Sequence, residues 1–402
     1  MEKIINIKDR KFLITMIMLI FVSRFFISLV VMQTRNGELS QDEGLYSEKA
    51  LMLSFQMKGE RNIIKYFADY FINDYDTMHK DYGLNLYTRM LGWFYYLFGY
   101  QIQTARLINA AIFAIAFLFV FYTAKTVFDP KIARTASAIF AFFPSMLLWS
   151  SMICGDVVII ACVTAFIFFM IHFLKSKKWV SYFVLMLLFL FLARLAGSYV
   201  ANLLMVFAIA GVFYKIFFLM HKKIRIAVLS FIAGAMILAC LNNGAVDFIK
   251  AKYDRMAYAM IKSQEGRAVA DDSSYAIYPS GCYVDRRCTL PELAGAYTKG
   301  MGYALFSPFP WRIDSKLQLA AYPQMILWYI MLPFALYGIY LGYRSRRMET
   351  VVIFLYCFCA MSILALAEGN VGSMFRHRDI VTPFLLIYFA AGFEWIRQKY
   401  FT

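Results

Sequence analysis

The amino-acid sequence predicts an all-α polytopic membrane protein with about ten transmembrane helices. Of its 402 residues, 61% are hydrophobic and only 16% are charged, whereas soluble domains carry roughly 25% charged residues. Apolar stretches near the ~20 residues that cross a bilayer recur along the chain. Lys and Arg fall in short runs between these stretches. The charge of +16 is therefore read as a topology signal and not as a nucleic-acid-binding face, which needs clustered basic residues.

Ten apolar segments are predicted to span the membrane. They are residues 12–32, 104–124, 132–150, 157–174, 179–197, 199–220, 226–244, 323–343, 349–367 and 379–396. The first is too long for the apolar region of a signal peptide and lacks a small-x-small cleavage site, so it is interpreted as a span. Residues 84–100 are ambiguous, because Arg89, Gly92 and Gly99 interrupt them.

The positions of the basic runs decide whether residues 84–100 cross the membrane. If they do not, Lys and Arg occupy every predicted cytoplasmic loop, at residues 3–11, 125–134, 175–178, 215–225, 344–347 and 397–399. If they do, every run after them moves outside, against the positive-inside rule. We therefore predict that both termini are cytoplasmic and that residues 84–100 form a juxtamembrane or half-inserted helix.

Residues 1–402 are interpreted as a single transmembrane domain with two large extracytoplasmic loops, 33–103 and 245–322. In the first loop, apolar residues recur at helical spacing from Ile63 to Phe71, which predicts a juxtamembrane amphipathic helix. In the second, Cys282 and Cys288 lie close together in a polar stretch. A disulfide is expected there if the loop is extracytoplasmic. A zinc site is the weaker interpretation, because no His lies nearby.

The predicted topology gathers unusual polar residues on the outer face. Asp42 and Glu43 follow the first span, and Asp156 lies in a tight turn before another. Basic candidates on the same face are Arg194, Arg376, His377 and Arg378. A carboxylate can take the proton of an attacking hydroxyl, and a second can hold Mg or Mn or orient the acceptor. Arg binds phosphate oxygens in pairs, and His adds a donor. These residues suit group transfer from a phosphate-linked lipid.

Each candidate also has a structural interpretation. Asp42 and Asp156 can cap helices, and Glu43 can be a first-turn acid favoured by the helix dipole. Arg194 can extend its side chain to the membrane interface. Arg376 and Arg378 can bind the headgroups of membrane lipids. These alternatives stay open at the level of sequence.

Three stretches of the chain resemble the GT-C superfamily of membrane glycosyltransferases. Residues 42–46 (Asp-Glu-Gly-Leu-Tyr) are similar to the Asp-Glu-x-x-Tyr that follows the first span in the protein mannosyltransferase and aminoarabinose transferase branch. Residues 97–107 resemble the segment that enters its second span, and residues 127–144, with Asp156 beyond, resemble its third. The resemblance implies that Asp42 is the base that activates the acceptor and that Asp156 shapes the site. The family's proline-rich run before the second span is absent.

The resulting functional prediction is an inverting glycosyltransferase that uses a polyprenyl-phosphate-linked sugar and a glycan or lipid acceptor. It is expected in a bacterial inner membrane, acting extracytoplasmically in surface polysaccharide or glycolipid synthesis. A polymerase of O-antigen or capsule repeats is the first alternative. A lipid-linked sugar flippase is the second, although transporters show repeats and mid-membrane charges that this sequence does not display.

Overall fold

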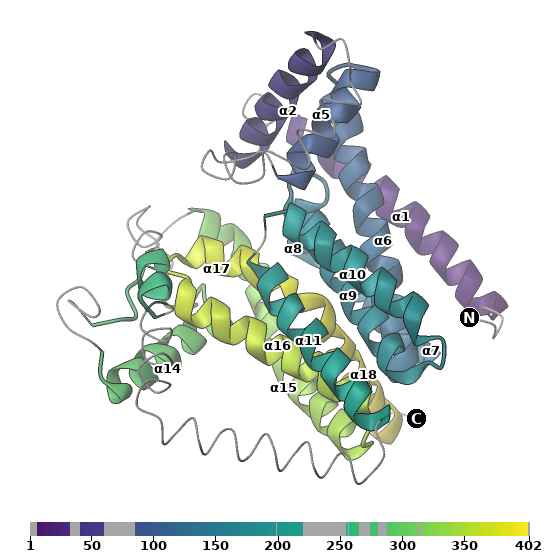
Figure 1. Ribbon diagram of the computed structural model, residues 1–402, viewed down its shortest axis with the longest axis vertical. Helices are drawn as coiled ribbons and strands as arrows, with labels where there is room; N and C mark the ends of the chain where they lie inside the picture. Colours follow the sequence, from purple (N-terminus) through teal and green to yellow (C-terminus); the bar gives the residue numbers. More distant parts are fainter. Residues whose placement is uncertain are drawn as a thin grey trace. The chain divides into compact units, whose positions relative to one another are not determined.

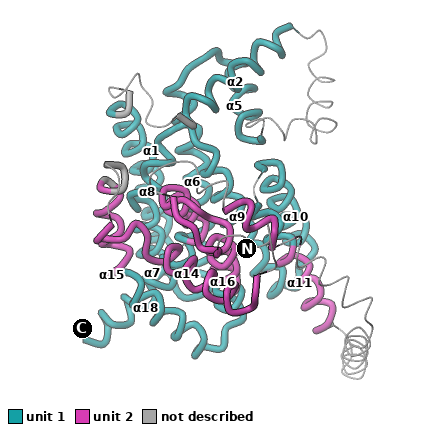
Figure 2. Tube along the Cα trace, turned by 90° about the vertical axis from the view of Figure 1, so that its left-hand side faces the viewer, with its two compact units in different colours: residues 1–205, 331–354, 382–402 teal, residues 206–330, 355–381 magenta. Residues whose placement is uncertain are grey.

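The computed structural model describes residues 6–32, 41–59, 85–197, 199–219, 255, 257–264, 274–279, 288–312 and 316–400. Within these ranges the chain is helical, apart from turns, short irregular stretches and one antiparallel bridge between Ser274 and Asn370 (Figure 1). It divides into two compact units, shown in Figure 2. Unit 1 comprises residues 1–205, 331–354 and 382–402, and unit 2 comprises residues 206–330 and 355–381.

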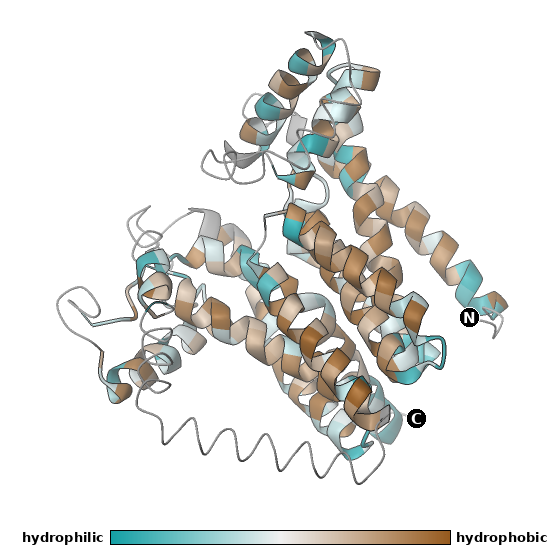
Figure 3. Ribbon diagram, in the orientation of Figure 1, coloured by the Kyte–Doolittle hydropathy of each residue, from teal (hydrophilic) through white to brown (hydrophobic). Residues whose placement is uncertain are grey.

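Unit 1 is built around helix α6 (Ile102–Val127). Helices α1 (Ile7–Met32), α7 (Pro130–Phe142) and α9 (Asp156–Lys175) pack against α6. Around this core, α10 (Trp179–Leu195) packs on α9, and α18 (Thr382–Tyr400) packs on α7. Helices α2 (Gln41–Gly59) and α5 (Leu86–Phe98) pack on each other. Figure 3 shows apolar residues along the middle of α9 and α10 and hydrophilic residues at the nearby turns.

Prolines and side-chain caps set the helix boundaries in unit 1. The Asp129 carboxylate accepts hydrogen bonds from the backbone N–H groups of Lys131 and Ile132, at 2.7 and 2.9 Å, so it caps α7, whose first residue is Pro130. Phe143 adopts extended backbone angles before Pro144, because a residue that precedes proline avoids the helical region. The predicted span 132–150 is therefore two helices, α7 and α8 (Pro144–Trp149).

Unit 2 contains α14 (Leu290–Phe306), α17 (Val371–His377) and the 3-10 helix η2 (Arg378–Ile380). Helices α11 (Val200–Leu219), α15 (Lys316–Arg344) and α16 (Met348–Ala367) run through the division between the units, so each contributes residues to both. Gly300 of α14 lies so close to α16 that a Cβ atom would come within 1.9 Å of the Ala365 carbonyl oxygen. Glycine is required at this helix contact.

The described residues include six helices long and apolar enough to cross a membrane: α1, α6, α9, α11, α15 and α16. The α17–η2 segment and α18 form a seventh candidate, bent by 67°. Helix α10, with 17 residues, is shorter, and α5 has 13. These helices support an integral membrane protein. The predicted span 226–244 and the helix predicted from Ile63 to Phe71 lie outside the described residues, and the count of ten spans stays a prediction.

Candidate functional site

The site in unit 1 is organised by Glu43, in the first turn of α2. Its carboxylate is almost completely buried, with 1% of the side chain exposed. The Oε1 atom accepts a hydrogen bond from Arg106 Nε at 2.8 Å and another from the backbone N–H of Ile153 at 3.0 Å. One carboxylate thus joins the start of α2 to helix α6 and to the segment that leads into α9.

Arg106 completes this ion pair from the first turn of α6 and is equally buried. Its Nη1 donates to the backbone carbonyl of Ser28 in α1 at 3.2 Å. A charged side chain inside an apolar helix is costly unless it finds a partner, and removing one member of a buried pair leaves an uncompensated charge. The pair therefore ties α1, α2 and α6 together at one place.

Asn109 holds the chain just before α9. It lies one helical turn after Arg106, so both side chains belong to the same face of α6. The Asn109 Nδ2 donates to the carbonyl oxygens of Met152 and Cys154, the latter at 3.1 Å. Two adjacent turns of α6 thus anchor α2 and the 152–154 segment.

Asp156 is half-buried and is the first residue of α9, where Gly155 occupies the N-cap position. The Cys154 thiol lies 3.4 Å from Asp156 Oδ2. The Asp156 carboxylate is therefore placed at the positive end of the α9 dipole. It follows directly the segment that Asn109 and Glu43 hold.

Tyr46 and Tyr87 lie against this segment, and Tyr95 lies near Glu43 and Arg106. The Tyr46 and Tyr87 rings meet edge to face with centroids 5.3 Å apart, and the Tyr46 hydroxyl lies against Gly155. Burial raises the pKa of Tyr87 well above its ordinary value, the Cys154 thiol adds to the rise, and Asn109 lowers it in part. Burial also raises the pKa of Tyr95 to about 12, although a hydrogen bond with Ser47 opposes the rise. Tyr87 and Tyr95 therefore keep their protons at neutral pH and stay available as hydroxyl donors.

Asp42 lies in the first turn of α2, directly before Glu43, and its side chain lies outside the described residues. Its role as base therefore stays a prediction. Arg194 lies in the last turn of α10 and is exposed.

The other three predicted phosphate ligands belong to unit 2. Arg378 is buried, and its Nη1 donates to the carbonyl oxygens of Ala304 and Ser307, at 3.3 and 3.1 Å, where α14 ends. Its guanidinium also stacks 4.5 Å from the Trp328 ring. Arg378 is thus engaged with the backbone and an aromatic ring.

His377 and Arg376, by contrast, are half-exposed at the end of α17. His377 Nδ1 lies 2.6 Å from Oε1 of the fully buried Glu368. A carboxylate bound to one ring nitrogen fixes the orientation of the imidazole. The opposite edge of the ring is then directed away from Glu368.

The predicted disulfide and the predicted divalent cation both involve side chains outside the described part of the chain. Cys288 is disulfide-bonded, and its predicted partner Cys282 lies outside the described residues. Among the residues that the structure describes, no group of three or more His, Cys, Asp or Glu side chains could hold a metal ion. Because the Asp42 side chain is outside that set, the predicted divalent cation stays untested.

Arg106 and Asn109 were not predicted as site residues from the sequence. Arg106 had one visible signal, which is a charge near the start of an apolar span. Asn109 had none beyond its spacing, because an amide in a helix does not reveal that it reaches a loop about 45 residues later.

A comparison with models of protein families indicates the class of protein to which this site is similar. Residues 87–243 match the family model of the dolichyl-phosphate-mannose-protein mannosyltransferases. The match begins in α5, so it contains Arg106, Asn109 and Asp156 but not Asp42 or Glu43. It supports a GT-C membrane glycosyltransferase and confirms the resemblance found in the sequence. A comparison with curated proteins finds no match.

Proposed function

We propose that this protein transfers a sugar from a polyprenyl-phosphate donor to an acceptor hydroxyl at the extracytoplasmic face of a bacterial inner membrane. The observation that carries the proposal is the Glu43–Arg106 ion pair with its third partner, the N–H of Ile153. It fixes the residue next to Asp42 against the segment that ends at Asp156. The family match over residues 87–243 supplies the reaction class and supports a lipid-linked donor.

In the proposed reaction, the Asp42 carboxylate takes the proton of the acceptor hydroxyl as its oxygen attacks the anomeric carbon. The bond between that carbon and the phosphate oxygen breaks, and polyprenyl phosphate leaves with the electron pair. Attack from the face opposite the leaving group inverts the anomeric centre. Asp156 orients the acceptor, or holds a divalent cation if the reaction needs one. Glu43 is a positioning residue, because its carboxylate already accepts two hydrogen bonds.

Positive charge near the leaving phosphate stabilises the transition state. We assign this role to Arg376 and His377, which are half-exposed, with Arg194 as a further candidate. Arg378 is assigned the supporting role of holding Arg376 and His377, because its guanidinium binds the carbonyl oxygens at the end of α14. Arg378→Lys is then expected to weaken folding, whereas Arg376→Gln weakens donor binding.

The central test is Asp42→Asn in purified protein with a radiolabelled polyprenyl-phosphate sugar donor. Asparagine keeps the size of aspartate, but it cannot accept the proton. We expect transfer to fall by at least about 100-fold, within the range for general-base catalysis, while donor binding and the unfolding midpoint stay unchanged. Full activity of Asp42→Asn would remove Asp42 as base.

The matched control is Asp129→Asn, because Asp129 caps α7 and lies outside the proposed site. It is expected to keep full transfer activity. The length of the product, measured by mass spectrometry, separates single transfer from polymerisation. Products extended by many repeats would favour the polymerase instead.

A further inference from the structure

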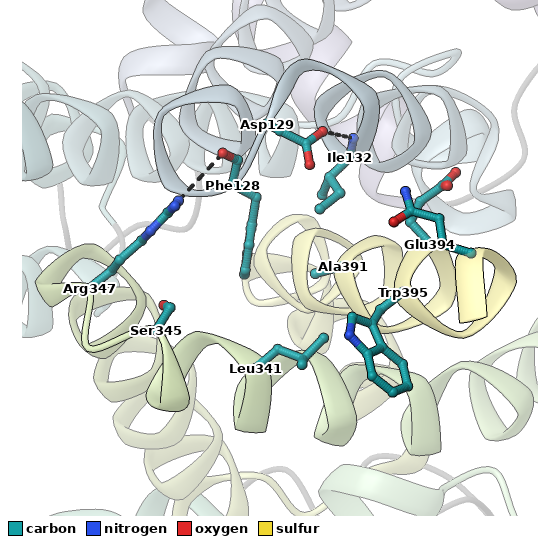
Figure 4. Close-up of a pocket in the computed structure, with 10 residues that line it drawn as sticks. Phe128, Asp129, Ile132, Leu341, Ser345, Arg347, Ala391, Glu394 and Trp395 are labelled. Carbon is teal, nitrogen blue, oxygen red and sulfur yellow. Dashed lines mark hydrogen bonds between the residues drawn. The ribbon is translucent and has the colours of Figure 1, made fainter.

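Unit 1 contains a pocket of about 250 Å³ at the C-terminal end of α6. The proposed catalytic site lies at the other end of this helix, where Arg106 is in the first turn. The pocket lies where α6 ends, α7 begins and α15 and α18 end (Figure 4). Helices α6, α15 and α18 each carry Lys or Arg in the last turn, which is typical of the level of lipid headgroups. The charge pattern predicts this side to be cytoplasmic.

The pocket is lined by apolar side chains and by charged side chains of both signs. Phe128, Leu341 and Trp395 are among its apolar lining residues, and Asp129, Arg347 and Glu394 are its charged ones. Figure 4 shows Arg347 at one side of the pocket and Glu394 with Trp395 at the other. An occupant with both an apolar part and separated charges would match this arrangement.

The charges of the lining residues are not equally available. Glu394 is paired with Lys131 at 2.9 Å and with Arg397 at 3.0 Å, so its charge is compensated inside unit 1. Asp129 uses Oδ1 to accept the backbone N–H groups at the start of α7, and within the described part of the chain no hydrogen bond to Oδ2 is seen. Arg347 uses Nη1 to bind the carbonyls of Val127 and Phe128. An Arg side chain has five N–H donors, so Nε and Nη2 remain for a phosphate.

We propose that this pocket binds the headgroup of phosphatidylethanolamine, with its phosphate on Arg347 and its ammonium on Asp129. A zwitterion satisfies one group of each sign, whereas an anionic headgroup would meet the Asp129 carboxylate without a compensating cation. One water occupies about 30 Å³ in the liquid, so the pocket has room for roughly eight heavy atoms, which is the size of a phosphoethanolamine group. We assign a lipid because the apolar wall continues along α15, which is long and apolar enough to cross a membrane. Tyr337, one turn before Leu341 in α15, contacts Trp395 with ring centroids 5.0 Å apart.

The test is native mass spectrometry of the purified full-length protein with added lipids that have identical acyl chains. We expect one phosphatidylethanolamine to bind about tenfold more tightly than phosphatidylcholine, because a trimethylated ammonium cannot donate a hydrogen bond to Asp129 and a charge-assisted bond contributes on this scale. Equal binding of the two lipids, or tighter binding of phosphatidylglycerol, overturns the proposal.

Asp129→Asn sharpens the test, because Asn is as good a helix cap as Asp and removes only the charge. It is expected to abolish the preference for phosphatidylethanolamine over phosphatidylcholine. The control is Glu292→Gln, which removes a carboxylate charge that accepts a backbone N–H at the start of another helix, α14, and does not line the pocket; it is expected to keep the preference. A preference that survives Asp129→Asn contradicts the proposed contact.

A soluble competitor distinguishes a lipid from a cytosolic zwitterion. Glycerophosphoethanolamine carries the same headgroup without acyl chains. We expect it to displace the lipid only at concentrations at least about 100-fold higher, because each buried CH₂ contributes about 0.8 kcal/mol. If the soluble headgroup binds as tightly as the lipid, the acyl chains make no contact and the lipid assignment is wrong.

Discussion

The buried ion pair between Glu43 and Arg106 makes a quantitative prediction about what holds α2 in place. Both side chains are 1% exposed, and their charged atoms are 2.8 Å apart. Removing one partner of such a pair costs about 3–5 kcal/mol, because the other charge stays buried without compensation. Glu43→Gln keeps an oxygen that can accept the N–H of Ile153, so its cost should lie near 3 kcal/mol. Arg106→Met, which leaves the Glu43 carboxylate without its compensating positive charge, should cost about as much.

The double variant Glu43→Gln/Arg106→Met is expected to be far less destabilised than the sum of the single variants. Replacing a buried pair by residues of similar volume is often nearly neutral, so the coupling energy should be about 3 kcal/mol or more. The free energy of unfolding is measured by SDS titration in mixed micelles, followed by circular dichroism.

The matched control is the ion pair between Lys175 and Glu349 in the same unit. The Glu349 side chain is 8% exposed, but the Lys175 side chain is 52% exposed. Solvent therefore screens the interaction, and the coupling energy for Glu349→Gln/Lys175→Met should be about 0–1 kcal/mol. The explanation by burial is refuted if the Glu43–Arg106 coupling falls below ~1 kcal/mol or equals that of the control.

Three further predictions address pH, packing and the site. The pKa of Tyr95 is about 12, above the ordinary ~10 of the phenol, so the folded state holds the proton more tightly. The raised pKa contributes to the free energy of unfolding fully below pH ~10, and this contribution is lost as the pH rises toward 12, by up to about 1.4 kcal/mol per pH unit. Tyr95→Phe should therefore reduce the fall in the free energy of unfolding between pH ~10 and ~12, measured by denaturant titration at each pH. Gly300→Ala should destabilise the fold by at least ~2 kcal/mol, because the added Cβ atom would clash with the Ala365 carbonyl. In the control Gly302→Ala the added Cβ atom meets no other atom within 4 Å, so this variant should be stabilised by about 0.5–1 kcal/mol. Equal unfolding midpoints of the two variants would contradict the contact between Gly300 and Ala365. Asn109→Ala should lower the turnover number of transfer about 10–100-fold by releasing the 152–154 segment, with folding retained on size-exclusion chromatography, and unchanged turnover would show that this anchor is dispensable.

Local sequence signals identified most helix positions but not their continuity. Apolar length located α6, α9 and α16 within three residues at each end, because a membrane helix must satisfy its backbone hydrogen bonds within itself. Helix α15 begins seven residues before the predicted span. The same criterion predicted one span over residues 132–150, where Pro144 separates two helices. The bend between η2 and α18 was equally invisible to a hydropathy count. Such breaks depend on what the neighbouring helices can stabilise.

By itself, the sequence determined that this protein is a helical membrane protein that resembles the GT-C glycosyltransferases, and it indicated the acidic pair Asp42–Glu43 as the place to look. Composition and motif spacing suffice for that, because both are properties of the linear chain. Only the tertiary structure decided that Glu43 is bound to Arg106 and Ile153, and that Arg378 binds backbone carbonyls. Partners 63 and 110 positions apart in the chain leave no local trace, since they are brought together by the packing of whole helices.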